Sequence, residues 1–335
     1  MLIDATLLQR PGEEILVGED IYGGMFRLLS KITRGQGVLL TAVDTTDLSK
    51  VEAAITPKTK LMHMESPSNP LMEITDVKAL ADICSAAGVL LSVDATMMSP
   101  YLMKPLELGA DICVQSATKF FGGHADTMGG FVSCKNAHIA NQIAFCQNAE
   151  GTALGPFDAW LFLRGIKTMA IRIDRAQSTA QSIAEMLEAH SAVTRVYYAG
   201  LPSHPGHALH RSQARGAGSV ISFTTGSLVL SKRVVDASRL FKLTVSFGSV
   251  HSLCEMPCTM SHASVPEEER TLPADLIRLS IGIEDPLDLM EDLRHAFDLA
   301  ASTVPDIIKF KKAEQLLFDS QFEDMPMVPA PPSKL

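Results

Sequence analysis

An alternation of short apolar segments with helical segments constrains the fold of this chain more than any other feature of its sequence. We predict strands at residues 14–17, 38–43, 60–64, 89–93 and 112–115, and helices at residues 25–31, 47–57 and 76–87. Strands that alternate with helices pair in parallel, and the helices then cover both faces of the sheet. The pattern therefore predicts an α/β fold with a large domain built on a parallel sheet, which a strand at 128–134 extends.

The rest of the chain has a different pattern, in which a long helical segment precedes more widely spaced strands. The helical segment runs from residue 158 to about residue 189 and is weakly broken at Gly165. Beyond it we predict strands at 194–198, 219–223, 243–247 and 276–280, and helices at 232–241 and 288–300. We therefore expect a large domain over residues 1–160, a connecting helix with a smaller C-terminal α+β domain over residues 161–303, and a poorly ordered, proline-rich extension over residues 304–335.

Composition and charge limit the kinds of molecule that this protein can bind. The formal net charge of −9 excludes nucleic acid and anionic membranes as the main partner. No apolar run reaches the roughly 20 residues of a membrane-spanning helix, so we expect no membrane partner. The six cysteines form no Cys-x-x-Cys pair and lie mostly in apolar segments, which is typical of reduced core residues in an intracellular compartment.

The first candidate for chemistry is Lys119, which follows the strand predicted at 112–115. The hydroxyls of Ser116 and Thr118 are natural phosphate ligands, and the pair Phe120-Phe121 gives the lysine partly apolar surroundings. Such surroundings lower the pKa of an ammonium and make the amine a usable nucleophile or base. The stretch therefore suggests a lysine that holds a phosphate-bearing aldehyde as a Schiff base. The alternative is an ordinary lysine that extends to solvent from the edge of a strand.

Asp94 is the second candidate, because it ends the buried strand at 89–93. Ligands of open α/β sheets lie at the carboxyl ends of the strands, so Asp94 and Lys119 can face one crevice. A buried carboxylate needs a partner, and a protonated pyridine nitrogen would be one. The alternative is an aspartate that only caps the turn at Thr96.

Three further residues suit a planar, charged ligand. Tyr22, on a glycine-flanked turn, can stack on a planar ring, and Asn69 can donate to a ring hydroxyl oxygen. Arg278 alternates with apolar neighbours on a strand, which suits bidentate binding of a carboxylate. The alternatives are ordinary packing for Tyr22, a turn for Asn69, and for Arg278 a salt bridge to Glu284 or Asp285.

Two patterns resemble binding motifs but favour structure. His204, His207 and His210 have metal-like spacing, yet a Pro-Gly turn separates them and no cysteine or carboxylate ligand is near, so we predict no metal. The segment Gly216-Ala-Gly218 precedes a strand instead of opening a helix, so it is not a dinucleotide-binding fingerprint.

Five motifs occur in the order that is typical of one enzyme family. They are Asp20-Ile-Tyr-Gly-Gly24, Glu65-Ser-Pro-Ser-Asn-Pro70, Ser92-Val-Asp-Ala-Thr96, Ser116-Ala-Thr-Lys-Phe120 and Arg278-Leu-Ser-Ile-Gly-Ile-Glu-Asp285. The chain thereby resembles the Cys/Met-metabolism pyridoxal-phosphate enzymes, which include the trans-sulfuration enzymes, over roughly residues 1–300. Segments 147–158, 163–169, 197–207 and 246–264 are most similar to the plant-type lyases that act by β-elimination.

The resemblance implies a fold, a cofactor and a set of site residues. The fold is that of fold-type I enzymes, and the cofactor is pyridoxal 5′-phosphate. The resemblance implies that Lys119 forms the Schiff base, that Asp94 pairs with the pyridinium, and that Tyr22 stacks on the ring and has a catalytic role. It implies that Asn69 contacts the ring hydroxyl and that Ser116 and Thr118 bind the phosphate. It further implies that Arg278 binds the substrate α-carboxylate and that Ser252 positions Lys119 and the substrate. Such enzymes assemble as homotetramers, dimers of dimers, with active sites at dimer interfaces.

The activity implied is a carbon–sulfur lyase of methionine biosynthesis, with L-cystathionine as the small-molecule substrate and homocysteine, pyruvate and ammonia as products. One alternative is a γ-acting relative, a γ-lyase or a γ-synthase. His251 bears on this choice, because many γ-acting relatives carry an acidic residue at its position. A second alternative is a catalytically weak paralogue that serves as an assembly subunit.

The start of the chain motivates this second alternative. Residues 2–9 have the pattern of the helix that, in the family, follows a phosphate-binding Ser-Gly-Met segment. Neither this segment nor a Tyr-x-Arg segment further upstream is present, so we expect an N-terminally incomplete chain or weak cofactor binding. The N-terminus lacks the features of a transit peptide, so we expect a cytoplasmic protein, or a plastid protein if the natural chain carries one.

Overall fold

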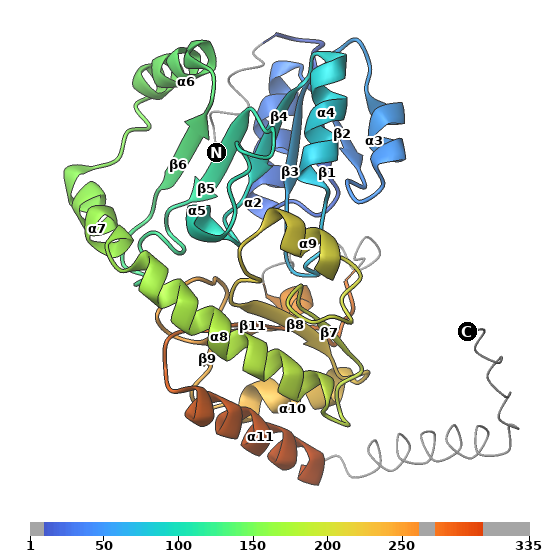
Figure 1. The fold of residues 1–335 in the computed structure, drawn as a ribbon, viewed down its shortest axis with the longest axis vertical. Coiled ribbons are helices and arrows are strands. Elements are labelled where there is room, and N and C mark those ends of the chain that lie inside the picture. Colours follow the sequence, from blue (N-terminus) through green and yellow to red (C-terminus); the bar gives the residue numbers. More distant parts are fainter. Residues whose placement is uncertain (1–9, 261–271, 304–335) are drawn as a thin grey trace, which may run out of the picture.

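The first sheet of the computed structural model, which describes residues 10–260 and 272–303, has six strands (Figure 1). Their order is β2 (Leu39–Val43), β1 (Glu14–Gly18), β3 (Thr59–Glu65), β4 (Leu90–Asp94), β5 (Ile112–Ser116) and β6 (Gly130–Cys134). The first five strands are parallel and β6 is antiparallel to β5. The predicted parallel sheet is therefore confirmed, with one antiparallel strand at its edge.

Helices α2 (Gly23–Arg27), α3 (Leu48–Ala54), α4 (Val77–Ala87), α5 (Ser99–Leu102) and α6 (Ala137–Glu150) connect or flank these strands. The N-cap of α4 is Asp76, whose carboxylate accepts from the backbone N–H of Ala79 at 2.9 Å. The helix ends at Gly88, whose φ of 68° is left-handed. The predicted helix at 25–31 begins as α2 and continues as a π-helical turn, Leu28–Thr33.

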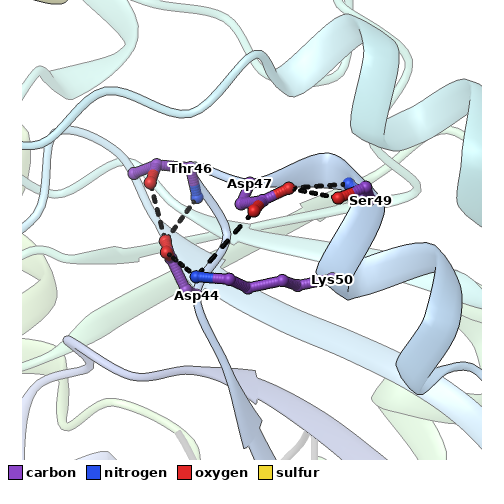
Figure 2. A network of polar contacts seen from close by, with 5 residues as sticks. All are labelled: Asp44, Thr46, Asp47, Ser49 and Lys50. Carbon is purple, nitrogen blue, oxygen red and sulfur yellow. Dashed lines mark hydrogen bonds and ion pairs between the residues drawn. The ribbon is translucent and has the colours of Figure 1, made fainter.

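The start of α3 shows how short polar side chains fix a helix end (Figure 2). Asp47 accepts from the backbone N–H and the hydroxyl of Ser49, at 3.1 and 2.6 Å. Lys50 donates to Asp44 at 2.9 Å, and Asp44 also accepts from Thr46. The hydroxyl of Thr46 and the ammonium of Lys50 together hold the pKa of Asp44 below its ordinary value. This network caps a helix at the surface and lies apart from the site described below.

The second sheet has five strands in the order β7 (Arg195–Tyr197), β8 (Val220–Thr224), β11 (Ile277–Ser280), β10 (Leu253–Glu255) and β9 (Lys242–Leu243). Helices α9 (His207–Gln213), α10 (Leu228–Ala237) and α11 (Pro286–Thr303) accompany it. The strand expected at 243–247 is the two-residue β9, and α9 lies between the strands expected at 194–198 and 219–223, where we predicted no helix. Strand β10 and helix α6 were not predicted.

Helix α8 (Met169–Glu188) connects the two sheets and lies beside the second one in Figure 1. Met169 and Ile173, near its start, belong to the core of the first sheet, whereas Ile183 and Leu187, near its end, belong to the core of the second. The long helix predicted from residue 158 is therefore two helices, α7 (Pro156–Ile166) and α8. Because α8 packs into both cores, it fixes how the two sheets lie relative to each other.

The predictions of a helix at 2–9, of a domain start before residue 10 and of an extension at 304–335 concern residues outside the described ones, as does the part of the predicted 161–303 unit at 261–271. Within residues 10–260 and 272–303, no helix combines the length and the apolar character needed to cross a membrane.

Candidate active site

Lys119 lies just beyond the carboxyl end of β5, where its side chain meets a loop of the second sheet. Its Nζ donates to Oγ of Ser246 at 2.8 Å and lies 4.8 Å from the centroid of the Phe247 ring. Burial lowers the pKa of Lys119 to about 8; the charge of Arg278 adds to this effect and that of Glu255 opposes it. A part of the amine is thus neutral near physiological pH, a lowered pKa that the apolar neighbours in the sequence led us to expect.

The loop that carries Ser246 packs tightly against the turn after Lys119. Ser246 has a left-handed φ of 100°. A Cβ atom on Gly248, whose φ is 80°, would lie 3.1 Å from the backbone nitrogen of Phe120 and 3.2 Å from Cβ of Lys119. The backbone N–H of Val250 donates to the carbonyl of Gly123 at 2.8 Å. A residue without a side chain at position 248 therefore allows this close approach.

Arg278 lies on β11 with only 3% of its side chain exposed. Its Nη1 donates to Oδ1 of Asn69 at 2.7 Å and is 2.8 Å from Oε1 of Glu255, while its Nη2 donates to the carbonyl of Ser246 at 2.8 Å. Its Nε is buried and has no hydrogen-bond partner within the described part of the chain. The salt bridge that we considered for Arg278 exists, but its partner is Glu255 on β10 instead of Glu284 or Asp285.

Asp94 ends β4 at the same edge of the first sheet, in register with Glu65 at the end of β3. It accepts from the backbone N–H of Thr96 at 2.8 Å, which is the turn contact that we had considered. Glu65 accepts from the backbone N–H of Tyr22, so the turn that carries Tyr22 is tied to this edge. Burial raises the pKa of Glu65 well above its ordinary value, and the charge of Asp94 raises it further. The raised pKa favours the neutral form of the Glu65 carboxyl group.

The remaining predicted residues have protein partners of their own. Oγ1 of Thr118 accepts from the backbone N–H of Gly129 at 3.1 Å, and Ser116 is partly buried at the end of β5. Ser252 donates to Glu284 at 2.9 Å and accepts from the N–H of Gly282 at 2.9 Å. The hydroxyl that contacts Lys119 belongs to Ser246, which the sequence reasoning missed although it opens the segment 246–253 quoted for the resemblance.

Arg172, on α8, is a second buried arginine near Lys119. Its Nη2 donates to the carbonyls of Phe120 and Gly165, both at 2.9 Å, and its Nε donates to Oγ1 of Thr168 at 3.2 Å. A Cβ atom on Gly123, whose φ is 72°, would lie 2.0 Å from Nη1 of Arg172. The guanidinium thus occupies the space beside this glycine and holds the turn that follows Lys119.

The histidines of the second sheet bond to the backbone. A ring nitrogen of His207 bonds to the carbonyl of Ala199 at 2.8 Å, and one of His210 to the carbonyl of Gly216 at 2.9 Å. Nδ1 of His204 accepts from the N–H of Gly206 at 3.1 Å. Within the described ranges, 10–260 and 272–303, histidine, cysteine and carboxylate side chains form no group that could hold a metal ion.

Comparisons with known proteins show the family of this chain and agree with its fold. The model of the family described as Cys/Met metabolism PLP-dependent enzyme matches residues 2–298. The chloroplastic cystathionine beta-lyase of Arabidopsis thaliana is 53% identical over 303 residues, which are 90% of this chain and 64% of that protein. The chain belongs to this family, its fold is that of the fold-type I enzymes, and its cofactor is pyridoxal phosphate.

Other relatives act at a different carbon. The cystathionine gamma-lyase of Bacillus subtilis is 43% identical over 87% of this chain and 78% of that protein. The structure of a cystathionine gamma synthase from Xanthomonas oryzae pv. oryzae in complex with cystathionine has a TM-score of 0.87 and 39% identity, and the match covers 90% of this chain and 80% of that one. The chain spans about 64% of the length of its plant and fungal β-lyase relatives.

The described residues fit this cofactor. Lys119 presents an amine with a lowered pKa, and Asp94 presents a carboxylate at a strand end, where the ligands of such sheets lie. Nε of Arg278, which is buried and finds no hydrogen-bond partner among residues 10–260 and 272–303, offers a donor to an anionic group. The residues that we predict to hold the cofactor are Lys119, Asp94, Tyr22, Asn69, Ser116 and Thr118.

Proposed function

We propose that this protein is a pyridoxal-phosphate-dependent carbon–sulfur lyase that cleaves L-cystathionine by β-elimination to homocysteine, pyruvate and ammonia. One observation carries the proposal: Ser246 links Lys119 and Arg278, since its hydroxyl accepts from Nζ of Lys119 and its carbonyl accepts from Nη2 of Arg278. A base and a carboxylate-binding group are thereby held beside each other, which the deprotonation of an amino acid requires. The plant and fungal relatives named cystathionine beta-lyase support this choice of substrate.

When bound, pyridoxal phosphate supplies the electron sink that stabilises negative charge at Cα of the amino acid. The protein supplies position and proton transfer. Arg278 holds the α-carboxylate, and the amine of Lys119 takes the proton from Cα, because its pKa of about 8 leaves part of it neutral near neutral pH. The hydroxyl of Ser246 orients that amine. The carboxylate of Asp94 holds the proton on the ring nitrogen of the cofactor.

The test is the identity of the keto acid. The protein is loaded with cofactor and incubated with L-cystathionine, and pyruvate and 2-oxobutyrate are measured separately. Pyruvate with homocysteine supports the proposal, whereas a dominant yield of 2-oxobutyrate with cysteine would replace it with γ-cleavage. The absence of both products would favour the catalytically weak assembly subunit. The same assay with a family-like N-terminal segment added shows whether phosphate ligands limit turnover.

The γ-acting relatives make γ-cleavage the second candidate, and His251 is the residue that bears on the choice. His251 is 55% exposed, and its Nδ1 lies 4.0 Å from Oε1 of Glu284. A histidine here does not repel the distal carboxylate of cystathionine, whereas an acidic side chain would. Replacing His251 with glutamate should therefore raise KM for cystathionine; an unchanged KM would assign His251 to the solvent-exposed loop alone.

We further propose that the protein is a homo-oligomer, a tetramer built from two dimers. Large apolar side chains on α6, α7 and α8 are exposed, a pattern that marks interaction surfaces. They include Phe145, Phe157, Trp160, Leu163 and Ile171. Light scattering measures the assembly directly, and Trp160→Glu should reduce the mass of the particle. A monomeric wild type would overturn this part of the proposal.

The cysteines bear on the compartment. Burial raises the pKa of the Cys84, Cys113 and Cys254 thiols to about 12. Buried, unreactive thiols suit a reducing intracellular compartment, which we propose for this protein. Imaging of the tagged natural protein tests this, and secretion would contradict it.

A further inference from the structure

Glu255 is a buried carboxylate that the proposed mechanism has not used. It lies on β10 directly opposite Arg278 on β11, in an antiparallel register pair. The two side chains are 1% and 3% exposed, and their charged atoms are 2.8 Å apart. Burying two charges costs several kcal/mol, so an ion pair that only joined two strands would be a poor replacement for two apolar side chains. Stability alone therefore does not explain why this buried ion pair is present.

The donors of Arg278 supply that reason. Its Nη1 is used by Glu255 and by Asn69, and one N–H of Nη2 is used by the carbonyl of Ser246. An arginine has five N–H donors in a planar fork, so the donors that remain are Nε–H and the second N–H of Nη2. Nε and Nη2 form one edge of the guanidinium, which is the edge that binds a carboxylate through two parallel hydrogen bonds. Glu255 occupies the opposite side.

We propose that Glu255 is a positioning residue of the amino-acid site, which holds the guanidinium of Arg278 so that its Nε–Nη2 edge faces the α-carboxylate of the substrate. This inference rests on the proposed function, because it requires Arg278 to bind a carboxylate. The charge of Glu255 also balances that of Arg278 near Lys119: Arg278 lowers the pKa of the amine and Glu255 raises it.

The experiment compares the binding of two amines to the cofactor-loaded protein. L-alanine has an amine and an α-carboxylate but no leaving group, whereas ethylamine has only the amine. Binding of each is followed through the absorbance of the bound cofactor, and the ratio of the two dissociation constants measures recognition of the carboxylate. Glu255→Gln should weaken L-alanine binding about tenfold relative to ethylamine binding, since an uncharged amide holds the guanidinium less firmly.

Two further variants separate positioning from stability. Glu255→Asp keeps the charge but has a side chain one methylene shorter. Its ratio of ethylamine to L-alanine dissociation constants should therefore lie between those of the wild type and Glu255→Gln. Asp292, 7% exposed, is the matched control because its carboxylate accepts from the backbone N–H groups of Arg239 and Leu240, at 3.0 and 2.9 Å. Asp292→Asn should lower the melting temperature and leave the ratio unchanged.

The outcomes distinguish the inference from the function on which it rests. If the wild type binds L-alanine no better than ethylamine, Arg278 is not a carboxylate site and the proposed function fails. If the wild type discriminates and Glu255→Gln discriminates equally well, the role of Glu255 is overturned. If Glu255→Gln does not fold, Glu255→Asp decides: its ratio should fall about threefold, and an unchanged ratio overturns the inference.

Discussion

The two buried arginines near Lys119 differ in what holds them. Arg172 comes from a helix and donates mostly to backbone carbonyls, those of Phe120 and Gly165. Arg278 comes from a strand and contacts the side chains of Glu255 and Asn69, and it keeps a buried Nε without a hydrogen-bond partner within the described residues. Burial lowers the pKa of both guanidinium groups.

This difference indicates different tasks. Backbone carbonyls are satisfied by Arg172 in the structure as it stands, so that arginine fixes the turn after Lys119 and needs no ligand. A buried donor without a partner costs free energy unless a ligand satisfies it, which is the situation of Arg278. A buried arginine therefore indicates a binding site when some of its N–H donors lack a hydrogen-bond partner. Burial alone does not indicate a binding site.

The largest effect is expected for Lys119, which lies near both arginines. Lys119→Ala should lower turnover by several orders of magnitude, because the anchor of the cofactor and the general base are the same amine. Reduction of the loaded wild type with borohydride, followed by peptide mapping, should place the pyridoxyl group on Lys119. Lys104, whose side chain is 56% exposed, is the control: Lys104→Ala should keep full activity. Label on any other lysine would refute the assignment.

Arg278 should show the next largest effect, and on binding. Arg278→Ala should raise KM for the amino acid roughly 10- to 100-fold, because a charge-assisted contact of about 1.5–3 kcal/mol is lost. Arg278→Lys should recover only part of this, since a point charge lacks the planar fork. Steady-state kinetics on both variants provide the measurement. Equal KM values for wild type and both variants would place the carboxylate site elsewhere.

Arg172 should show a smaller effect, and on stability. Arg172→Met removes the guanidinium donor from the carbonyls of Phe120 and Gly165 and should lower the free energy of unfolding by about 1–3 kcal/mol. The ratio of L-alanine to ethylamine binding should not change. Arg175, one turn along the same helix and 46% exposed, is the control, and Arg175→Met should stay within about 0.5 kcal/mol of the wild type. A changed binding ratio in Arg172→Met would erase the distinction between the two arginines.

The sequence predicts those parts of this arrangement that depend on local pattern. Strand periodicity and strand ends predicted the parallel sheet and the positions of Lys119 and Asp94, because a short strand leaves its next polar residue at the sheet edge. Arg278 stood out for a similar reason, as a charge among alternating apolar residues. Such signals lie within a few residues of the side chain concerned.

The partners of these residues could not be predicted, because they depend on pairing between distant segments. Ser246 lies 127 positions from Lys119, and the left-handed turn that presents it follows a strand of only two residues. Glu255 contacts Arg278 through the register of a three-residue strand, whereas the sequence offered only nearby acidic residues as partners. Arg172 has the pattern of an ordinary helical arginine, since nothing local marks its inward face.

The smallest predicted effect is a change in the pKa of Lys119, which tests how Arg278 differs from Arg172. Burial and the charge of Arg278 lower this pKa to about 8, and Glu255 opposes them, so Glu255→Gln should move it below about 8. Only the neutral amine attacks an aldehyde, so the rate at which the cofactor-free protein captures pyridoxal phosphate should rise with pH through this pKa. The midpoint of that rise should lie at lower pH in Glu255→Gln than in the wild type.

The protonation steps of the cofactor itself are common to both proteins and cancel in the difference. Arg172→Met is the control, because Arg172 does not contribute to the shift of the Lys119 pKa. A midpoint at higher pH in Glu255→Gln would contradict the charge balance between Arg278 and Glu255.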